Sequence, residues 1–319
     1  MRNETHIMIV SLFAGPGGAC EGIHQATGQH PIGIERNPDA VATRDAAGHV
    51  TLVADLATMT PCDLDVDVDG LWASPPCPAF STAGDREGHA DLEHLCWLAA
   101  RHITWGPLCA PGGWAHPDSQ LIVNTLWWVK THRPRWVAFE QVPAVAPVWA
   151  AACLGLEQLG YSTWSGVLNA ADQGVPQTRQ RAFLMASRDK LVCPPIPTHS
   201  KHPAEVPLWG SLLPWVSMAD ALGYGPRALA YNRGTGMTER HGDRAPTPIS
   251  DPAPTITGHG KDMRWVLPAG ETRCEPHELA TLQGFRDGYP FQGSRTAQFR
   301  QIGDAVPPPM ARAIVEALI

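Results

Sequence analysis

The sequence contains no run of about 18 consecutive apolar residues, the length that a transmembrane helix needs. Its first ten residues, MRNETHIMIV, show no basic stretch followed by a long apolar segment, so no secretory leader is expected. None of the eight cysteines belongs to a CxxC pair, which argues against a zinc knuckle and against a disulfide framework. These absences lead us to expect a cytoplasmic protein with no metal centre and no membrane partner.

The prolines and glycines, 31 and 30 of them, follow no period, which argues against collagen-like and repeat architectures. A chain of 319 residues with 44% hydrophobic residues is long enough to bury a full core. We therefore expect a loop-rich enzyme, built as one large α/β domain alone or with a smaller domain attached.

Positive charge is scarce in the first half of the chain. Residues 1–178 hold 8 Lys/Arg and 18 Asp/Glu, net −10, whereas residues 179–303 hold 15 and 11, net +4. The remaining tail adds −1, which gives the overall −7. A phosphate-binding face needs only local positive charge, so the second half can still hold a polyanion. Ordinary asymmetry of surface charge explains the same numbers.

Short apolar runs that end on glycine-rich or polar residues predict buried strands alternating with helices. This pattern indicates an α/β fold with a doubly wound, mostly parallel, Rossmann-like sheet. From about residue 188 to 273 the periodicity gives way to proline, glycine and isolated charges, which predicts a smaller, irregular domain. The expected strands are 6–13, 32–35, 50–55, 69–74 and 135–140, with an amphipathic helix at 119–134. The expected domains are 1–187, 188–273 and a segment 274–319 that returns to the first domain through a proline-initiated helix.

A glycine-rich turn, FAGPGG at 13–18, follows the first expected strand, and Glu35 ends the second. Glycines let the backbone approach a ligand closely, and an acid about 20 residues later can bind ribose hydroxyls. Asp55, at the end of the third strand, can accept a hydrogen bond from an adenine amino group. The alternative interpretations are a purely structural turn for the glycines and a helix cap for Asp55.

Cys77 lies between prolines in SPPCPAFS (74–81), at the end of another expected strand. The prolines would fix the thiol at the carboxyl edge of the sheet, where such folds bind ligands. A nucleophilic cysteine also needs surroundings that favour the thiolate, since free thiols have a pKa of about 8.5. Glu140 ends a further strand and is predicted to project toward the same edge.

Two arginines, Arg179 and Arg181, stand at alternate positions in QTRQR (177–181). On an extended segment alternate side chains point to one face, so the pair is predicted to face one ligand. Paired guanidinium groups suit a phosphate or a pyrimidine carbonyl. An exposed, salt-bridged strand edge is the alternative.

In this order the segments resemble the DNA (cytosine-5)-methyltransferase family. The matching motifs are FAGPGG (13–18), PPCPAFS (75–81), EQV (140–142), QTRQR (177–181), PAPTIT (252–257), LATLQGF (279–285) and QIGDAVPP (301–308). Together they span nearly the whole chain. Gln141 and Asp304 depart from the family, which usually has asparagine at both places. These departures raise the question of how the triplet braces the Cys77 loop, and of how an added carboxylate affects binding of the methyl donor.

The resemblance implies a class I methyltransferase that uses S-adenosylmethionine, acts as a monomer on double-stranded DNA, and rotates its target cytosine out of the helix. It implies that residues 188–273 read the DNA. The segment 78–90 is rich in small and polar residues and adjoins Cys77, which suits a loop that closes over the site; an ordinary surface loop is the alternative. The implied catalytic residues are Cys77, Glu140, Arg179 and Arg181. The implied cofactor-binding residues are Phe13, Gly15, Gly17, Glu35, Arg36, Asp55, Leu56, Pro76, Asp304 and Val306. The candidate DNA-binding residues are Ser81, Gln177, Arg227, Arg233, Arg240, Arg244 and Thr255.

Three other interpretations stay open at this point. The architecture also serves tRNA cytosine-5 methyltransferases, and the two departures are compatible with a catalytically silent DNA-binding homologue. A nicotinamide oxidoreductase would account only for the glycine-rich turn and Glu35. His199 and His202 could indicate a metal site, but without further ligands nearby in the sequence they are expected to be solvent-exposed.

Overall fold

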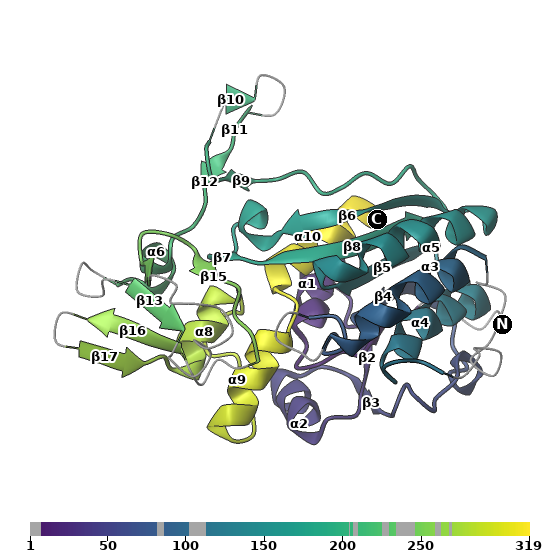
Figure 1. Ribbon diagram of the computed structural model, residues 1–319, viewed down its shortest axis with the longest axis horizontal. Helices are drawn as coiled ribbons and strands as arrows, with labels where there is room; N and C mark the ends of the chain where they lie inside the picture. The colour runs from purple at the N-terminus through teal and green to yellow at the C-terminus, as the bar shows by residue number, and fades with distance from the viewer. Residues whose placement is uncertain are drawn as a thin grey trace.

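The fold is built on a central seven-stranded sheet, shown in Figure 1. The computed structural model describes residues 8–81, 86–101, 113–203, 205–206, 210–224, 230–233, 246–258, 263–267 and 270–319. The strand order in the sheet is β3-β2-β1-β4-β5-β8-β6. These strands are β1 (Met8–Leu12), β2 (Ile32–Glu35), β3 (Thr51–Val53), β4 (Val68–Ala73), β5 (Trp136–Gln141), β6 (Ser162–Asn169) and β8 (Gln180–Ser187).

The first five strands of this sheet pair in parallel, whereas β8 runs antiparallel to both β5 and β6. β5 is buried along its whole length, as expected for a strand covered by helices on both sides. The predicted doubly wound, mostly parallel sheet is confirmed. Each of the five expected strands appears within two residues of its predicted ends.

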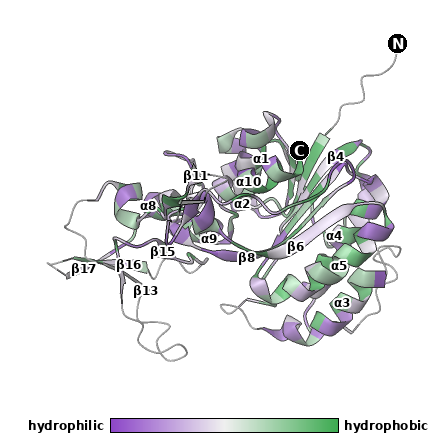
Figure 2. Cartoon of the chain, turned by 90° about the horizontal axis from the view of Figure 1, so that it is seen from above, coloured by the Kyte–Doolittle hydropathy of each residue, from purple (hydrophilic) through white to green (hydrophobic). Residues whose placement is uncertain are grey.

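Helices cover both faces of the sheet, as the view in Figure 2 shows. On one face, α3, α4 and α5 pack over a core that contains Ile122, Phe139 and Trp149. On the other face, α1 and α10 pack over a core that contains Trp72 and Phe183. In the described part of the chain, no helix has the length and apolar character needed to span a membrane. The helices are α1 (Gly18–Thr27), α2 (Pro38–Ala47), α3 (Leu92–Arg101), α4 (Ser119–His132), α5 (Ala146–Gln158) and α10 (Pro308–Leu318).

The last helix, α10, returns to the start of the chain and packs on α1 (Figure 1). Gly22 makes this close packing possible, because a Cβ built there would lie 2.4 Å from the carbonyl oxygen of Pro308. The proline-initiated helix thus packs on the first domain, as its sequence predicts. As a result, the segment just before α10 is carried to the edge of the sheet where β1 ends.

A smaller region lies beside the sheet and holds its own antiparallel sheet, in the order β14-β13-β16-β17 (Figure 1). Its core joins Met218, Ile256 and Trp265 to residues from α8 and α9, such as Leu279 and Phe299. Part of the predicted returning segment 274–319 therefore packs with the smaller region. The elements are α6 (Met218–Leu222), β13 (Ala230–Arg233), β14 (Thr247–Pro248), β16 (Met263–Leu267), β17 (Gly270–Arg273), α8 (Pro276–Leu282) and α9 (Arg295–Asp304).

Short strands connect the two regions. β7 and β15 pair in parallel beside the start of β8. β9 pairs with β12, and β10 pairs with β11. Their bounds are β7 (Gln177–Thr178), β9 (His199–Ser200), β10 (Glu205–Val206), β11 (Gly210–Ser211), β12 (Leu213–Pro214) and β15 (Ala253–Pro254).

Candidate active site

The candidate site forms where parallel strands end. The glycine-rich turn follows β1, Glu35 ends β2, the Cys77 segment follows β4, and Glu140 lies near the end of β5. Because β8 is antiparallel, it begins at this same edge and brings Arg181 there. Carboxyl ends of parallel strands are the usual ligand-binding edge of such sheets, so the fold brings these predicted site residues together.

The glycine-rich turn has a left-handed backbone at Phe13, Gly15 and Gly17, with φ of 55°, 53° and 104°. A Cβ at Gly15 would meet nothing within 4 Å, so the turn has open space at that point. At Gly17 there is no such open space. A Cβ there would lie 2.6 Å from the His49 ring and 2.8 Å from the Tyr289 hydroxyl oxygen. Gly17 thus lets two buried side chains approach the turn from inside.

Glu35 fixes the turn from the next strand. One of its carboxylate oxygens accepts the Gly15 N–H at 2.8 Å. The other accepts the backbone N–H groups of Arg36 and Asn37 at 2.8 and 2.7 Å. A carboxylate has about four lone-pair sites, so this one keeps acceptor capacity for a ligand hydroxyl.

Asp55 lies beside this turn, after β3. It accepts the Ala57 N–H at 2.9 Å and the Arg36 guanidinium at 2.7 Å. The Ala57 N–H is the main cause that holds the pKa of Asp55 below its usual value, and Arg36 acts in the same direction. Open space at Gly15, two strand-end carboxylates and the largely buried Leu56 form a surface that fits a nucleoside with ribose hydroxyls and a purine amine.

The Cys77 segment is a tight turn after β4. The Cys77 carbonyl accepts the N–H groups of Phe80 and Ser81 at 3.0 and 2.9 Å. The Phe80 side chain is 1% exposed and anchors the segment in the core. The Cys77 side chain is therefore held at the sheet edge by a buried anchor on its C-terminal side.

Gln141 braces the other side of this segment. Its amide nitrogen donates to the carbonyls of Pro75 and Pro76 at 3.0 and 3.1 Å, and its amide oxygen accepts the Val142 N–H. The side chain is 1% exposed, so these bonds have no competition from water. Gln141, although it departs from the family residue, fills the bracing role in full.

We expect Gln141→Leu to lower stability and slow the enzyme, because it leaves buried carbonyls of the Cys77 segment unpaired. An unsatisfied buried polar group costs about 1–3 kcal/mol. Thermal denaturation measures the first effect, and single-turnover methyl transfer measures the second. Unchanged turnover in a destabilised variant would show that the brace supports the fold without positioning Cys77.

Glu140 and Arg181 form an ion pair next to Cys77. The Arg181 Nε lies 3.0 Å from a Glu140 carboxylate oxygen, and the side chains are 12% and 11% exposed. Burial raises the pKa of the Cys77 thiol above its ordinary value. The charge of Arg181 opposes that rise, while Glu140 adds to it. Cys77 is thus held as a neutral thiol beside a cation that can stabilise the thiolate once Glu140 is engaged elsewhere.

Arg179 is almost fully buried, and a shared role with Arg181 at one ligand stays a prediction. The residue is 2% exposed, and its guanidinium donates to the carbonyls of Ile256 and Gly303 at 2.8 and 3.0 Å. Burial lowers the pKa of Arg179 to about 9, and the charge of Arg181 acts in the same direction, which leaves Arg179 charged at neutral pH. Its two hydrogen bonds tie the segment before β8 to the smaller region.

Comparison with known proteins gives the family. The family model described as C-5 cytosine-specific DNA methylase matches residues 7–104, 110–214 and 216–319. The chain belongs to the C-5 cytosine-specific DNA methylase family. The resemblance inferred from the motifs is therefore confirmed, as is the enzyme class, DNA (cytosine-5)-methyltransferase.

Curated relatives agree with this assignment, and a solved structure shares the fold. The type II methyltransferase M1.HphI of Haemophilus parahaemolyticus is 28% identical, with 97% of this chain and 86% of the relative covered. M.NaeI of Lentzea aerocolonigenes is also 28% identical, with 96% and 73% covered. The Dnmt2 methyltransferase of S. pombe shares the fold with a TM-score of 0.64 at 16% identity, and 98% of each chain is covered.

Within this methylase, Val306 of the GDAVPP motif adjoins the glycine-rich turn. A Cβ at Gly18 would lie 2.2 Å from the Val306 carbonyl oxygen, so the two motifs touch. The Asp304 side chain is 57% exposed and lies 3.6 Å from the Arg300 guanidinium. Its charge reaches Cys77 and helps to raise the pKa of that thiol. The carboxylate at position 304, where the resemblance implies asparagine, therefore acts on the thiol of Cys77.

We expect Asp304→Asn to lower the pKa of Cys77 and speed its alkylation by iodoacetamide at pH 7.5 by about two- to threefold. The effect is small because an exposed carboxylate is screened by solvent. The matched control is Asp189→Asn, which removes a carboxylate of similar exposure, 55%, just beyond the far end of β8. An equal acceleration in both variants would contradict a local effect of Asp304.

Gln177 is fully buried, which corrects its assignment to DNA contact. Its amide nitrogen donates to the Leu282 carbonyl at 3.3 Å, and its oxygen accepts the Ile256 N–H at 2.9 Å. Thr255 donates to the Thr178 carbonyl at 2.8 Å. Both residues hold the segment around β15 against β7, so Gln177 supports the packing of the smaller region.

The structure describes several other predicted residues only in part or not at all. Arg227, Arg240 and Arg244 lie outside the described residues, and Arg233 is described only as the last residue of β13. Of the predicted closing loop 78–90, residues 78–81 and 86–90 are described. His199 is half-buried and His202 exposed, and the described residues contain no group of three potential metal ligands.

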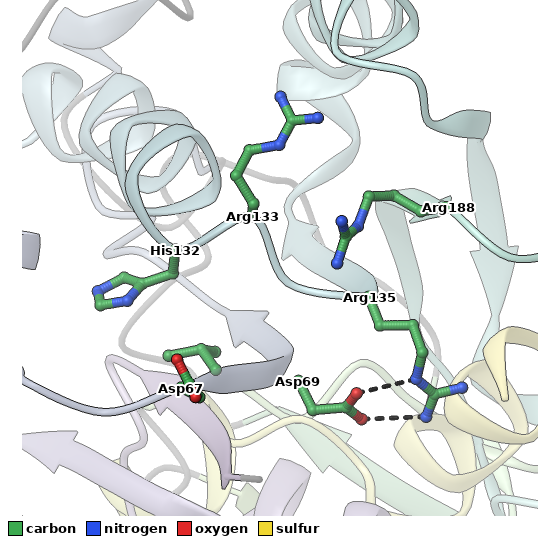
Figure 3. Close-up of a pocket in the computed structure, with 7 residues that line it drawn as sticks. Asp67, Asp69, His132, Arg133, Arg135 and Arg188 are labelled. Atoms are coloured by element: carbon green, nitrogen blue, oxygen red, sulfur yellow. Dashed lines mark hydrogen bonds and ion pairs between the residues drawn. The ribbon is translucent and has the colours of Figure 1, made fainter. Parts of the chain in front are cut away.

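A polar cavity of about 220 Å³ lies away from this site (Figure 3). It is lined by the first residues of β4 and by the segment before β5, which belong to the opposite edge of the sheet. Arg135 and Asp69 form a two-bond ion pair in it, at 2.9 and 3.0 Å, as the dashed lines show. It has no part in the chemistry at the carboxyl edge.

Proposed function

We propose that this methylase transfers a methyl group from S-adenosylmethionine to carbon 5 of a cytosine rotated out of duplex DNA, through a covalent bond to Cys77. The observation that carries the proposal is the meeting of the Cys77 thiol with the buried Arg181–Glu140 ion pair at the ligand-binding edge of the sheet. Family membership makes cytosine carbon 5 the acceptor atom.

Carbon 5 of cytosine is too weakly nucleophilic to take a methyl group directly. Cys77 solves this by losing its proton and forming a bond from sulfur to carbon 6, which places electron density on carbon 5. Carbon 5 then takes the methyl group, which leaves S-adenosylhomocysteine. Water next takes the proton from carbon 5, and the electron pair of that C–H bond expels the Cys77 sulfur from carbon 6. The ring regains aromaticity, and the thiolate is released for the next cycle.

Glu140 and Arg181 supply the electrostatic part of this reaction. In its protonated form Glu140 donates a hydrogen bond to ring nitrogen 3 and stabilises the charge that develops there. Protonation also removes a negative charge next to Cys77, so the thiolate becomes easier to form when the base is bound. Arg181 is then free to hold the cytosine carbonyl oxygen. Substrate binding and activation of the nucleophile are therefore linked.

The chain's residues fit the donor along β1 to β3. Glu35 offers its remaining lone pair to a ribose hydroxyl, and Asp55 can accept from the adenine amine. Phe13, Pro76 and Val306 supply apolar surface, and open backbone at Gly15 accommodates the donor's amino-acid part. When bound, S-adenosylmethionine supplies an electrophilic methyl group on a sulfonium sulfur.

Access to the cytosine requires DNA to be opened at the target base. Rotating a base out of a duplex costs a few kcal/mol, which protein contacts must offset. The net charge of +4 in residues 179–303 suits a phosphate-binding face, and the smaller region is the proposed reader of the DNA. We also propose that the enzyme works in the cytoplasm as a monomer.

The test is transfer of labelled methyl from S-adenosylmethionine to unmethylated genomic DNA and, separately, to tRNA. We expect 5-methylcytosine in DNA only, detected by nucleoside mass spectrometry, and bisulfite sequencing would then reveal the target sequence. Exclusive labelling of tRNA would overturn the proposal that DNA is the methyl acceptor. Cofactor binding without transfer to either acceptor would favour a silent DNA-binding homologue.

A further inference from the structure

A buried polar cluster supports the glycine-rich turn from inside. The Tyr289 hydroxyl donates to the Pro16 carbonyl, within the turn, at 2.6 Å. The same hydroxyl lies 3.1 Å from Nε2 of His49, which in turn lies 3.4 Å from a Glu21 carboxylate oxygen. Tyr289 and His49 are 7% exposed, so the cluster is shielded from water.

The geometry fixes the direction of these hydrogen bonds. Pro16 offers only a carbonyl, so Tyr289 must donate to it, and the phenol oxygen is then the acceptor for His49. His49 therefore carries its proton on Nε2, facing both the phenol oxygen and Glu21. Its Nδ1 is buried without a hydrogen-bond partner, so Nε2 is the ring nitrogen that takes part in the cluster.

Tyr289 belongs to the core of the smaller region, not to that of the central sheet. Its ring packs against Phe285 and Phe291, with centroids 4.6 and 5.0 Å apart. The Arg286 guanidinium lies over the same ring at 5.3 Å and 3.6 Å from Glu21. A single side chain thus joins the packing of the smaller region to a backbone atom of the glycine-rich turn.

We infer that Tyr289 is a positioning residue for the methyl donor: its bond to Pro16, supported by His49 and Glu21, holds the glycine-rich turn in the shape that binds the donor. The inference rests on the proposed function, because it assumes that this turn binds S-adenosylmethionine. Gly17 is required in this arrangement, since any side chain there would displace the His49 and Tyr289 groups.

The test replaces Tyr289→Phe, which removes the hydroxyl and keeps the ring packing. We expect the dissociation constant for S-adenosylhomocysteine, measured by calorimetry, to rise about five- to tenfold, in line with loss of one buried hydrogen bond. The KM for S-adenosylmethionine should rise by a similar factor, while kcat at saturating donor and the KM for DNA stay within about twofold.

Tyr161→Phe is the matched control. Tyr161 is also buried, and its hydroxyl donates to a proline carbonyl, that of Pro134, at the same 2.6 Å. Pro134 lies two residues before the start of β5, at the opposite edge of the sheet. Both variants should lose similar thermal stability, but only Tyr289→Phe should lose donor affinity. Equal donor affinity in the two variants would overturn the inference.

A second pair of variants tests the supporting histidine. His49→Gln can keep an N–H donor near the position of Nε2 and should retain donor affinity, whereas His49→Ala should lose it. Loss in both, with the melting temperature unchanged in His49→Gln, would contradict the assigned hydrogen-bond direction. If the unaltered protein does not bind S-adenosylhomocysteine at all, the proposed function fails, which is a different result.

Discussion

Replacing Cys77→Ala should reduce methyl transfer to DNA by about four orders of magnitude or more, the scale seen when a covalent nucleophile is removed. The reason is chemical: without the bond from sulfur to carbon 6, carbon 5 does not become nucleophilic enough to react. Affinity for DNA and for S-adenosylhomocysteine should stay within about threefold, because the Cys77 segment is anchored by Phe80 and Gln141 and not by the thiol. Single-turnover transfer of labelled methyl measures the rate.

Two controls make the result specific to this thiol. Cys153→Ala removes another partly buried thiol, in α5, and should leave the rate unchanged. DNA with fluorine at carbon 5 has no proton to lose there, so it should trap the unaltered enzyme as a covalent complex that resists denaturation. The Cys77→Ala protein should form no such complex. Normal turnover of that variant would refute the covalent mechanism.

The large domain can be predicted from sequence because its strands are short, apolar and separated by strong turn signals. The pattern predicts Ile32–Glu35 at its observed bounds, and the four glycine and proline residues of FAGPGG locate the turn after β1. The smaller region has no comparable signal. Its core joins residues as far apart in sequence as Met218 and Phe299, and no local periodicity reports such contacts.

The residues of the candidate site also fall into two groups, those that a local sequence pattern predicts and those that it does not. Cys77 and Glu140 follow strands that a local pattern reveals, so their meeting at one edge can be expected. The partners of Arg179 and Gln177 cannot be predicted in this way, since Gly303 and Leu282 are more than 100 positions away. The role of Tyr289 could not be predicted from the sequence for the same reason, although its partner Pro16 lies in a recognised motif.

Glu140→Gln should change two measurable rates in opposite directions. Methyl transfer should slow by about 10²- to 10³-fold, the usual cost of removing one group that stabilises charge in a transition state. A glutamine can still donate a hydrogen bond, but it cannot transfer a proton to ring nitrogen 3. Single-turnover kinetics at saturating donor and DNA would give the size of this loss.

Alkylation of Cys77 by iodoacetamide should become faster in the same variant. The Glu140 carboxylate raises the pKa of the thiol and also pairs with Arg181 at 3.0 Å. Without the Glu140 carboxylate, the positive charge of Arg181 acts on the Cys77 sulfur unopposed. The pKa of Cys77 therefore falls, and more thiolate is present near neutral pH. The alkylation rate should therefore begin to rise at a lower pH than in the unaltered protein.

Arg181→Gln provides the opposite case and separates the two causes. It removes the cation and leaves Glu140 beside the thiol, so both methyl transfer and alkylation should slow. A pair of variants that both lose activity while moving the pKa of Cys77 in opposite directions would mean that thiolate content alone does not set the rate. The ion pair would then restrain the nucleophile in the free enzyme and serve the cytosine once it is bound. Unchanged alkylation profiles in both variants would exclude electrostatic coupling between the Arg181–Glu140 ion pair and Cys77.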